Sequence, residues 1–155
     1  VATSGFTAAT SKGTDVNVTL TGTDANVTQL NAIASAAGGT VTASISITAS
    51  ETLTTLTTDA ITITVTDAAS VSEFNTLDSN TSTDIILSGG LSDTALSMMS
   101  TWGVPAAGFN AAAWQAPDVN ITLTSMDKNP TQFNDITSAA GRKISTSQPL
   151  SAPDA

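Results

Sequence analysis

An internal repeat constrains this chain more than any other feature of its sequence. Residues 15–41 read DVNVTLTGTDANVTQLNAIASAAGGTV, and residues 118–144 read DVNITLTSMDKNPTQFNDITSAAGRKI. At a constant offset of 103 along the chain, without a gap, 16 of the 27 positions are identical. Chance does not produce such a match, so the chain holds two copies of one structural unit, which is the signature of a repeat architecture.

Each copy reads as a strand followed by a helix. Over residues 16–20, apolar and polar residues alternate with the period of a half-buried strand. Val27, Leu30 and Ile33 then recur at helical spacing, and the glycine pair at 38–39 marks the end of the helix. The unit is therefore predicted to be a strand–helix pair.

Weaker versions of the unit lie between the two copies. Strands are predicted over 41–47, 61–65 and 85–87, which gives about five units in all. Each strand is followed by a short predicted helix, and the apolar residues expected on these helices are Leu53 and Leu56, then Val71, Phe74 and Leu77, then Leu96 and Met99.

These units predict an α/β repeat fold. Strands joined by helical crossovers run parallel. Because these strands alternate, rather than forming the continuous apolar runs of a sheet covered on both faces, all the helices are expected on one face. We therefore predict a βα solenoid over residues 15–144, with tails at 1–14 and 145–155. A compact single-sheet α+β domain is the alternative.

The uncovered face of the predicted sheet would carry hydroxyl groups. The threonines that the alternation places there are Thr19, Thr21, Thr62, Thr64, Thr66, Thr122 and Thr124. Ranks of this kind resemble the surfaces of ice-binding solenoids, and they would also suit a glycan. The plainer interpretation is that threonine favours strands and tolerates water.

Aspartates recur where a predicted strand gives way to a helix, at Asp24, Asp67, Asp93 and Asp127, with Asn26 as the alternative to Asp24 in the first copy. A side-chain oxygen at that position can accept a backbone N–H of the first helical turn, so we predict helix caps. Calcium binding is the alternative role. The sequence holds neither an EF-hand loop nor the Gly-rich nonapeptides of calcium-binding repeats, so no metal or cofactor site is predicted.

The segment 102–117, WGVPAAGFNAAAWQAP, interrupts the repeats as an insertion. It carries Trp102, Phe109 and Trp114. One interpretation is a flap that covers an open end of the core, because exposed ends of repeat arrays need capping. The other is an interface with a neighbouring subunit, since large aromatic residues dominate such interfaces.

The composition excludes several classes of function. The chain has no His and no Cys, which removes the commonest general base and the thiol nucleophile, so we predict that it is not an enzyme. It has four cationic side chains and a net charge of −9, which excludes the phosphate contacts of a nucleic-acid-binding protein. No apolar run approaches the roughly 20 residues of a membrane-spanning helix.

The stretches ITVTDAASVSEFNTLDS and LSGGLSDTALSMM are similar to known repeats. They resemble the short tandem repeats of VTDAA and LSDTA type in very large secreted and cell-surface proteins of bacteria, notably cyanobacteria. The resemblance covers roughly residues 15–100, with a further copy at 118–144. It implies an exported, repetitive, adhesive or envelope-building protein, and it brings no catalytic residues.

We therefore expect a structural or adhesive subunit of an extracellular assembly such as a fibre, surface layer or adhesin. A capsid or tail decoration protein of a virus is the first alternative, and ice or glycan binding through the threonine face is the second. Because the two end units are near-copies, self-association into an oligomer or filament is expected, with contacts from both tails and from the 102–117 segment.

Overall fold

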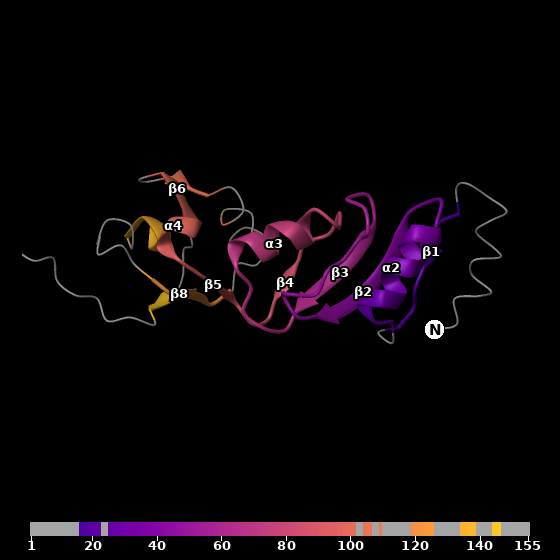
Figure 1. Cartoon of the computed structure of the whole chain (residues 1–155), viewed down its shortest axis with the longest axis horizontal. Helices are drawn as coiled ribbons and strands as arrows, with labels where there is room; N and C mark the ends of the chain where they lie inside the picture. Colours follow the sequence, from indigo (N-terminus) through magenta and orange to yellow (C-terminus); the bar gives the residue numbers. More distant parts are fainter. Residues whose placement is uncertain are drawn as a thin grey trace, which may run out of the picture.

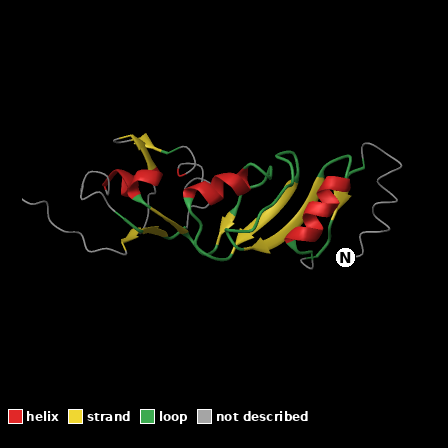
Figure 2. Cartoon of the chain, in the orientation of Figure 1, coloured by secondary structure: helices red, strands yellow, loops and turns green. Residues whose placement is uncertain are grey.

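The computed structural model describes residues 16–22, 25–101, 104–106, 109, 119–125, 134–138 and 144–146. Over these ranges the chain is an α/β fold of parallel strands and short helices, drawn out along one axis (Figure 1). The strands succeed one another along this axis, and α3 and α4 lie above them (Figure 2). The predicted α/β class with parallel strands is confirmed.

Two parallel sheets contain most of the strands. The larger has the order β1–β2–β3–β4, with the bounds Val18–Thr19, Val41–Ile47, Ala60–Val65 and Ile86–Leu87. The smaller has the order β5–β8–β9, with the bounds Leu91–Asp93, Ile121–Leu123 and Ile144–Thr146. A parallel bridge between Ala69 and Leu91 connects the stretch after β3 to the smaller sheet.

Helices and one antiparallel pair of strands complete the described elements. The helices are α2 (Val27–Ala36), α3 (Val71–Asp78) and α4 (Ala95–Met98), and residues 134–138 are also helical. The antiparallel pair is β6 (Met99–Thr101) with β7 (Val104–Pro105). The pair lies where the sequence departs from the repeats, so part of the insertion is tied back onto the end of α4.

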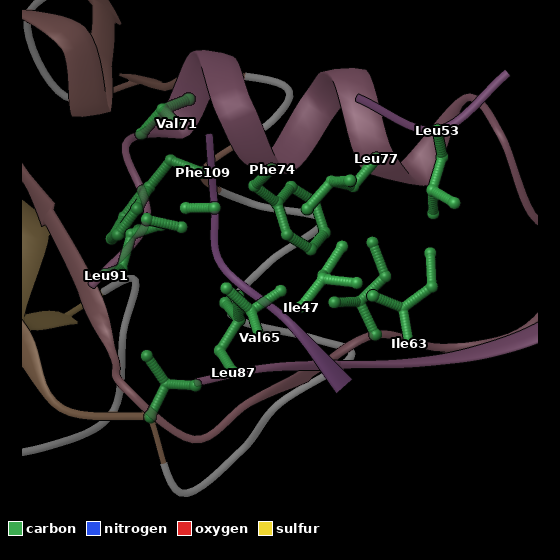
Figure 3. Packing of buried hydrophobic residues seen from close by; sticks show 14 of the residues in the cluster. Ile47, Leu53, Ile63, Val65, Val71, Phe74, Leu77, Leu87, Leu91 and Phe109 are labelled. Atoms are coloured by element: carbon green, nitrogen blue, oxygen red, sulfur yellow. The ribbon is translucent and has the colours of Figure 1, made fainter. Parts of the chain in front are cut away.

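The sheet is covered on one face, as its alternation predicts. In β2 the residues Val41, Ala43, Ile45 and Ile47 are buried, while the intervening residues are exposed. Ile61, Ile63 and Val65 of β3 are completely buried. They join the apolar residues of α2 and α3 in one cluster, and Figure 3 shows Phe74 and Leu77 pointing from α3 toward Ile47 and Ile63.

The two copies of the repeated sequence have the same local fold. Val18 pairs with Val41 in the first copy, and Ile121 pairs with Ile144 at the equivalent positions of the second. Both pairings are parallel and span the same length of chain. The copies nevertheless occupy different places, because β1 is the edge strand of the larger sheet and β8 is the inner strand of the smaller one. The β9 strand also extends the fold to Thr146, past the predicted boundary at 144.

The predicted helix at Leu53–Leu56 is wrong. Residues 51–56 are irregular, with Leu53 buried and Leu56 64% exposed. The register places Ala60 of β3 beside Thr42 of β2. The length of chain between these paired residues is the shortest between neighbouring strands of the larger sheet, and it leaves too little chain for a helix. The carboxamide of Asn31 ties the segment to α2, since it donates to the carbonyl of Thr52 and accepts the N–H of Thr54, both at 2.9 Å.

The helix predicted after Asp93 is present, but its buried side differs from the prediction. In α4 the residues Ala95 and Met98 are buried, whereas Leu96 is 67% exposed. The helix begins directly after Thr94, so its single turn directs Ala95 and Met98 to the core. Met99 is buried as well, but it belongs to β6.

The turn between the two sheets depends on glycine. Gly90 has φ +86°, a left-handed conformation that glycine adopts without steric cost. A Cβ atom on Gly89 would clash with the backbone of Asp67, so the backbones of two successive units meet closely there. The Gly-Gly pair therefore lets the chain pass from β4 to β5 while the units stay in contact.

Candidate binding surface

The uncovered face of the larger sheet is a plane of hydroxyl groups. Ser44 and Ser46 of β2 are exposed, and Thr62 and Thr64 of β3 are half-buried. The register places Ser44 beside Thr62 and Ser46 beside Thr64, across strands that lie about 4.8 Å apart. Neither strand contains a charged residue. Each hydroxyl both donates and accepts a hydrogen bond, so this plane suits an uncharged polar ligand.

The ranks of hydroxyl groups are short. One rank runs from Thr19 through Thr42 and ends at Ala60, and another ends at Ile86, whose side chain is 50% exposed. A methyl group and an apolar side chain therefore bound the hydroxyl plane. The most regular part is two strands wide.

The predicted threonines do not share one continuous face. Thr19, Thr62 and Thr64 belong to the larger sheet, Thr122 is half-buried in β8 of the smaller sheet, and Thr21, Thr66 and Thr124 are exposed beyond the ends of strands. The Thr66 hydroxyl also donates to the carbonyl of Ile47 at 3.0 Å. The candidate surface is therefore the part on β2 and β3, with Thr19 and Thr42 at its margin.

Helix capping by Asp67 and Asp93 is a wrong prediction. The capping side chains are Asn26 for α2, Ser70 for α3 and Thr94 for α4, and each accepts a backbone N–H of the first turn. Each cap directly precedes the first helical residue, whereas both aspartates lie further upstream. The capping-box partners Gln29 and Glu73 complete the first two of these caps.

The two aspartates connect successive units instead. The Asp67 carboxylate accepts the N–H of Ala49 at 2.7 Å. The Asp93 carboxylate accepts the N–H of Val71 at 3.0 Å, and it also accepts the N–H of Thr94 at 2.7 Å. In each case the side chain reaches a backbone donor of the preceding unit, so it holds two neighbouring units together.

Sequence reasoning missed Asp59, which makes the most buried of these connections. Its side chain is 2% exposed. One carboxylate oxygen accepts the N–H of Val41 and the other accepts the N–H of Leu56, both at 2.8 Å. Both oxygens are thus occupied by backbone donors, which gives Asp59 a structural role. An aspartate between a run of threonines and a strand gives no signal of burial in the sequence.

The only two glutamates of the chain border one open groove. The groove has a volume of about 280 Å³ and is lined by residues 49–52 together with Ser72, Glu73, Thr76 and Leu77 of α3. Glu51 accepts the N–H of Thr48 at 2.7 Å, and Glu73 accepts the N–H of Ser70 at 2.8 Å. Both carboxylates therefore stabilise local turns. The lining contains no His, Lys or Arg.

The aromatic residue of the insertion that the structure describes lies inside the molecule. Phe109 is completely buried, and Figure 3 shows it close to Val71 and Leu91. Phe109 is therefore not an exposed interface residue, which corrects that part of the interface prediction and agrees with a segment that covers the core. Trp102 and Trp114 lie outside the described residues.

Metal clusters and membrane-spanning helices are both absent from the described residues. Among them there is no group of three or more His, Cys, Asp or Glu side chains that could hold a metal ion, and Asp24 and Asp127 lie outside those residues. Over the same part of the chain, no helix is long and apolar enough to span a membrane. Comparison with protein-family models, curated proteins and solved structures finds no match to this chain.

Proposed function

We propose that this chain is a non-enzymatic structural or adhesive module of an extracellular surface assembly. The observation that carries the proposal is the one-sided sheet, which buries a continuous apolar face and turns an uncharged hydroxyl plane outward. Such a surface offers many weak, equivalent contacts and no reactive group. The resemblance to VTDAA- and LSDTA-type repeats of secreted surface proteins supports the same role.

We also infer that the chain winds as a βα solenoid. Each unit returns a strand to the side of an earlier one, and the paired residues are Val18 with Val41, Thr42 with Ala60, Thr64 with Ile86, Leu91 with Ile121, and Ile121 with Ile144. The longest return, from β5 to β8, contains the insertion. Side chains that accept a backbone N–H of the preceding unit, as those of Asp67 and Asp93 do, join the units. These features support an array in which each unit touches mainly its neighbours.

The hydroxyl plane favours a polysaccharide as the contacted surface. Ser and Thr hydroxyls can exchange hydrogen bonds with sugar hydroxyls, and the lack of charge on β2 and β3 leaves no electrostatic attraction to screen. Binding should therefore depend only weakly on salt. Ice binding is less well supported, because Ala60 and Ile86 interrupt the ranks that would have to match a lattice.

Retention on insoluble cell-wall polysaccharides tests this function. The double variant Ser44→Ala with Thr62→Val should lower retention several-fold, because both positions lie in the centre of the hydroxyl plane. The matched control is Thr28→Ala with Ser35→Ala, which removes two exposed hydroxyls from α2. Equal retention of both double variants, or no retention of the unmodified chain on any such polysaccharide, would contradict an adhesive role of this face.

The extracellular location needs a test of its own. An antibody raised against the purified chain should label intact cells of the source organism as strongly as it labels permeabilised ones. Labelling that requires permeabilisation would contradict a surface location. Labelling of purified virus particles instead of cells would favour the alternative of a capsid or tail decoration protein.

A further inference from the structure

We propose that the outer edge of β1 is a docking site for β9 of a second copy of this chain, so that chains join head to tail. This inference deepens the proposed assembly role and rests on it. The observation behind it is that one repeated sequence occurs twice. The edge that has no partner among the described strands in the first copy is covered by a strand in the second.

The second copy shows which backbone groups this edge offers. At the two ends of β8, the carbonyl of Asn120 accepts the N–H of Leu91 at 2.8 Å, and the N–H of Thr124 donates to the carbonyl of Asp93 at 2.9 Å. A parallel strand with the sequence Leu-Ser-Asp thus covers β8 on the side away from β9. Asn17 and Thr21 occupy the same positions of the repeat in the first copy.

In β1 the equivalent groups point away from the sheet. The N–H groups of Val18 and Leu20 donate to β2, at 2.9 and 2.8 Å. Because alternate residues of a strand bond to opposite sides, the backbone groups of Asn17, Thr19 and Thr21 face outward. Among the described strands, β1 has β2 as its only neighbour.

The apolar side chains of the described strand are also less deeply buried at this end. Among the described residues, the partly buried apolar residues that pack against the core are Val18, Leu20, Val27, Ala34, Ala37 and Ala106, and all but the last belong to the first copy. The counterparts of Val18 and Leu20 in β8, Ile121 and Leu123, are 3% and 0% exposed. Natural edge strands are commonly protected from pairing by charges or proline, and residues 16–22 contain neither.

The strand that fits this edge is β9. Its sequence, Ile-Ser-Thr, has the pattern of β5, an apolar residue followed by serine and a polar residue. β9 is the last described strand of the smaller sheet, while β1 is the first of the larger one, so they lie at opposite ends of the ladder of strands. In the repeat, Ile144 and Thr146 are equivalent to Val41 and Ala43, whose backbone N–H and C=O groups point toward the next strand, β3, rather than toward β1. The same backbone groups of Ile144 and Thr146 are therefore expected to point away from β8.

Head-to-tail docking would then copy the contact between β5 and β8. The N–H of Ile144 in one chain would donate to the carbonyl of Asn17 in the next, and the N–H of Thr21 would donate to the carbonyl of Thr146. The two surfaces differ, so the contact is heterologous and leads to filaments rather than closed pairs.

Two proline variants test this arrangement in the full chain. Thr19→Pro and Thr146→Pro each remove an outward N–H, and each should leave the bonds to β2 or β8 in place. By sedimentation velocity, the unmodified chain should grow in mass as its concentration rises, and each variant alone should remain a 15.5 kDa monomer. An equimolar mixture should form a dimer and stop there, because each variant keeps one intact edge.

Formation of that dimer also shows that both variants are folded. The proposal is overturned if the unmodified chain stays monomeric at its highest soluble concentration, or if either variant assembles as the unmodified chain does. It is equally overturned if the unmodified chain assembles while the mixture forms no dimer. None of these results bears on polysaccharide retention, so failure of the docking edge and failure of the adhesive role can be told apart.

Discussion

The first and second copies of the repeated unit share a local fold but differ in their surroundings. In both, the strand before the helix pairs in parallel with the strand after it. The helical residues Ile33 and Ile136 are 2% and 0% exposed at equivalent positions. Leu20, however, is only partly buried, whereas its counterpart Leu123 is completely buried. The difference follows from neighbours, because β8 lies between two strands and β1 has one described partner.

This difference separates what the unit's own sequence determines from what stacking adds. The alternating strand, the helix and the length of chain from strand to strand recur wherever the repeated sequence occurs. Burial of the strand depends on whether another unit lies against it. We therefore expect stability to rise with each neighbouring unit, and the first copy, whose strand has one described partner, to be less protected than the second.

The largest loss of stability is expected at the buried helical position that the two copies share. Ile33→Ala and Ile136→Ala should each lower the free energy of unfolding by about 2–5 kcal/mol, because each removes a buried side chain that holds its helix to the core. Urea unfolding of the two variants measures this. A large loss for one and almost none for the other would show that the two copies do not fold alike.

The next largest loss of stability is expected where the two copies differ in burial. Leu123→Ala should cost about 2–5 kcal/mol, since its side chain is completely buried. Leu20→Ala removes the same atoms from a partly buried position and should cost clearly less. The ratio of the two losses measures how much the strand on the far side of β8 contributes. Equal losses would mean that the edge of β1 is already covered.

A smaller effect is expected where side chains hold the start of β2. Asp59→Asn replaces one carboxylate oxygen by an NH2 group, which cannot accept the N–H of Val41 or of Leu56, and should cost about 1–3 kcal/mol. Asn17→Ala removes the exposed acceptor of the Thr40 N–H, 2.9 Å away, and should cost less because water can replace it. A larger loss in the free energy of unfolding for Asn17→Ala than for Asp59→Asn would contradict this order.

The smallest effect is expected on the hydroxyl plane. Thr64→Ala should change the free energy of unfolding by less than about 0.5 kcal/mol, because its side chain lies on the uncovered face. Ile63→Ala, at the neighbouring position on the buried face, is the matched comparison. Similar losses at the two positions would contradict a sheet that is covered on one side.

Sequence patterns predicted the elements whose signals are local. The strands at 41–47 and 60–65 alternate cleanly, and α3 has its apolar residues at helical spacing, so all three were foreseen. The irregular segment at 51–56 was not, because its shape depends on the short return of the chain from Thr42 to Ala60. The strand β5 was missed for a similar reason, since it is ordered by pairing with β8, which follows only after the insertion.

The candidate surface was predicted less completely than the fold. Alternation placed Thr62 and Thr64 correctly on the open face, but it could not show that Thr122 belongs to a second sheet. The aspartates looked like helix caps because they precede helices, and only the stacking of units brings Asp67 and Asp93 to donors of the previous unit. Contacts between units are set by register, which the sequence of one unit does not contain.

Amide hydrogen exchange of the dilute, monomeric chain compares the two edges most directly. The N–H groups of Thr19 and Thr21 should exchange quickly, because no described strand lies on that side of β1, whereas those of Thr122 and Thr124 should be protected by β5. At concentrations where the chain assembles, protection at Thr19 and Thr21 should rise toward that of the second copy. Equal protection of the two pairs in the monomer would contradict an open edge on the first copy.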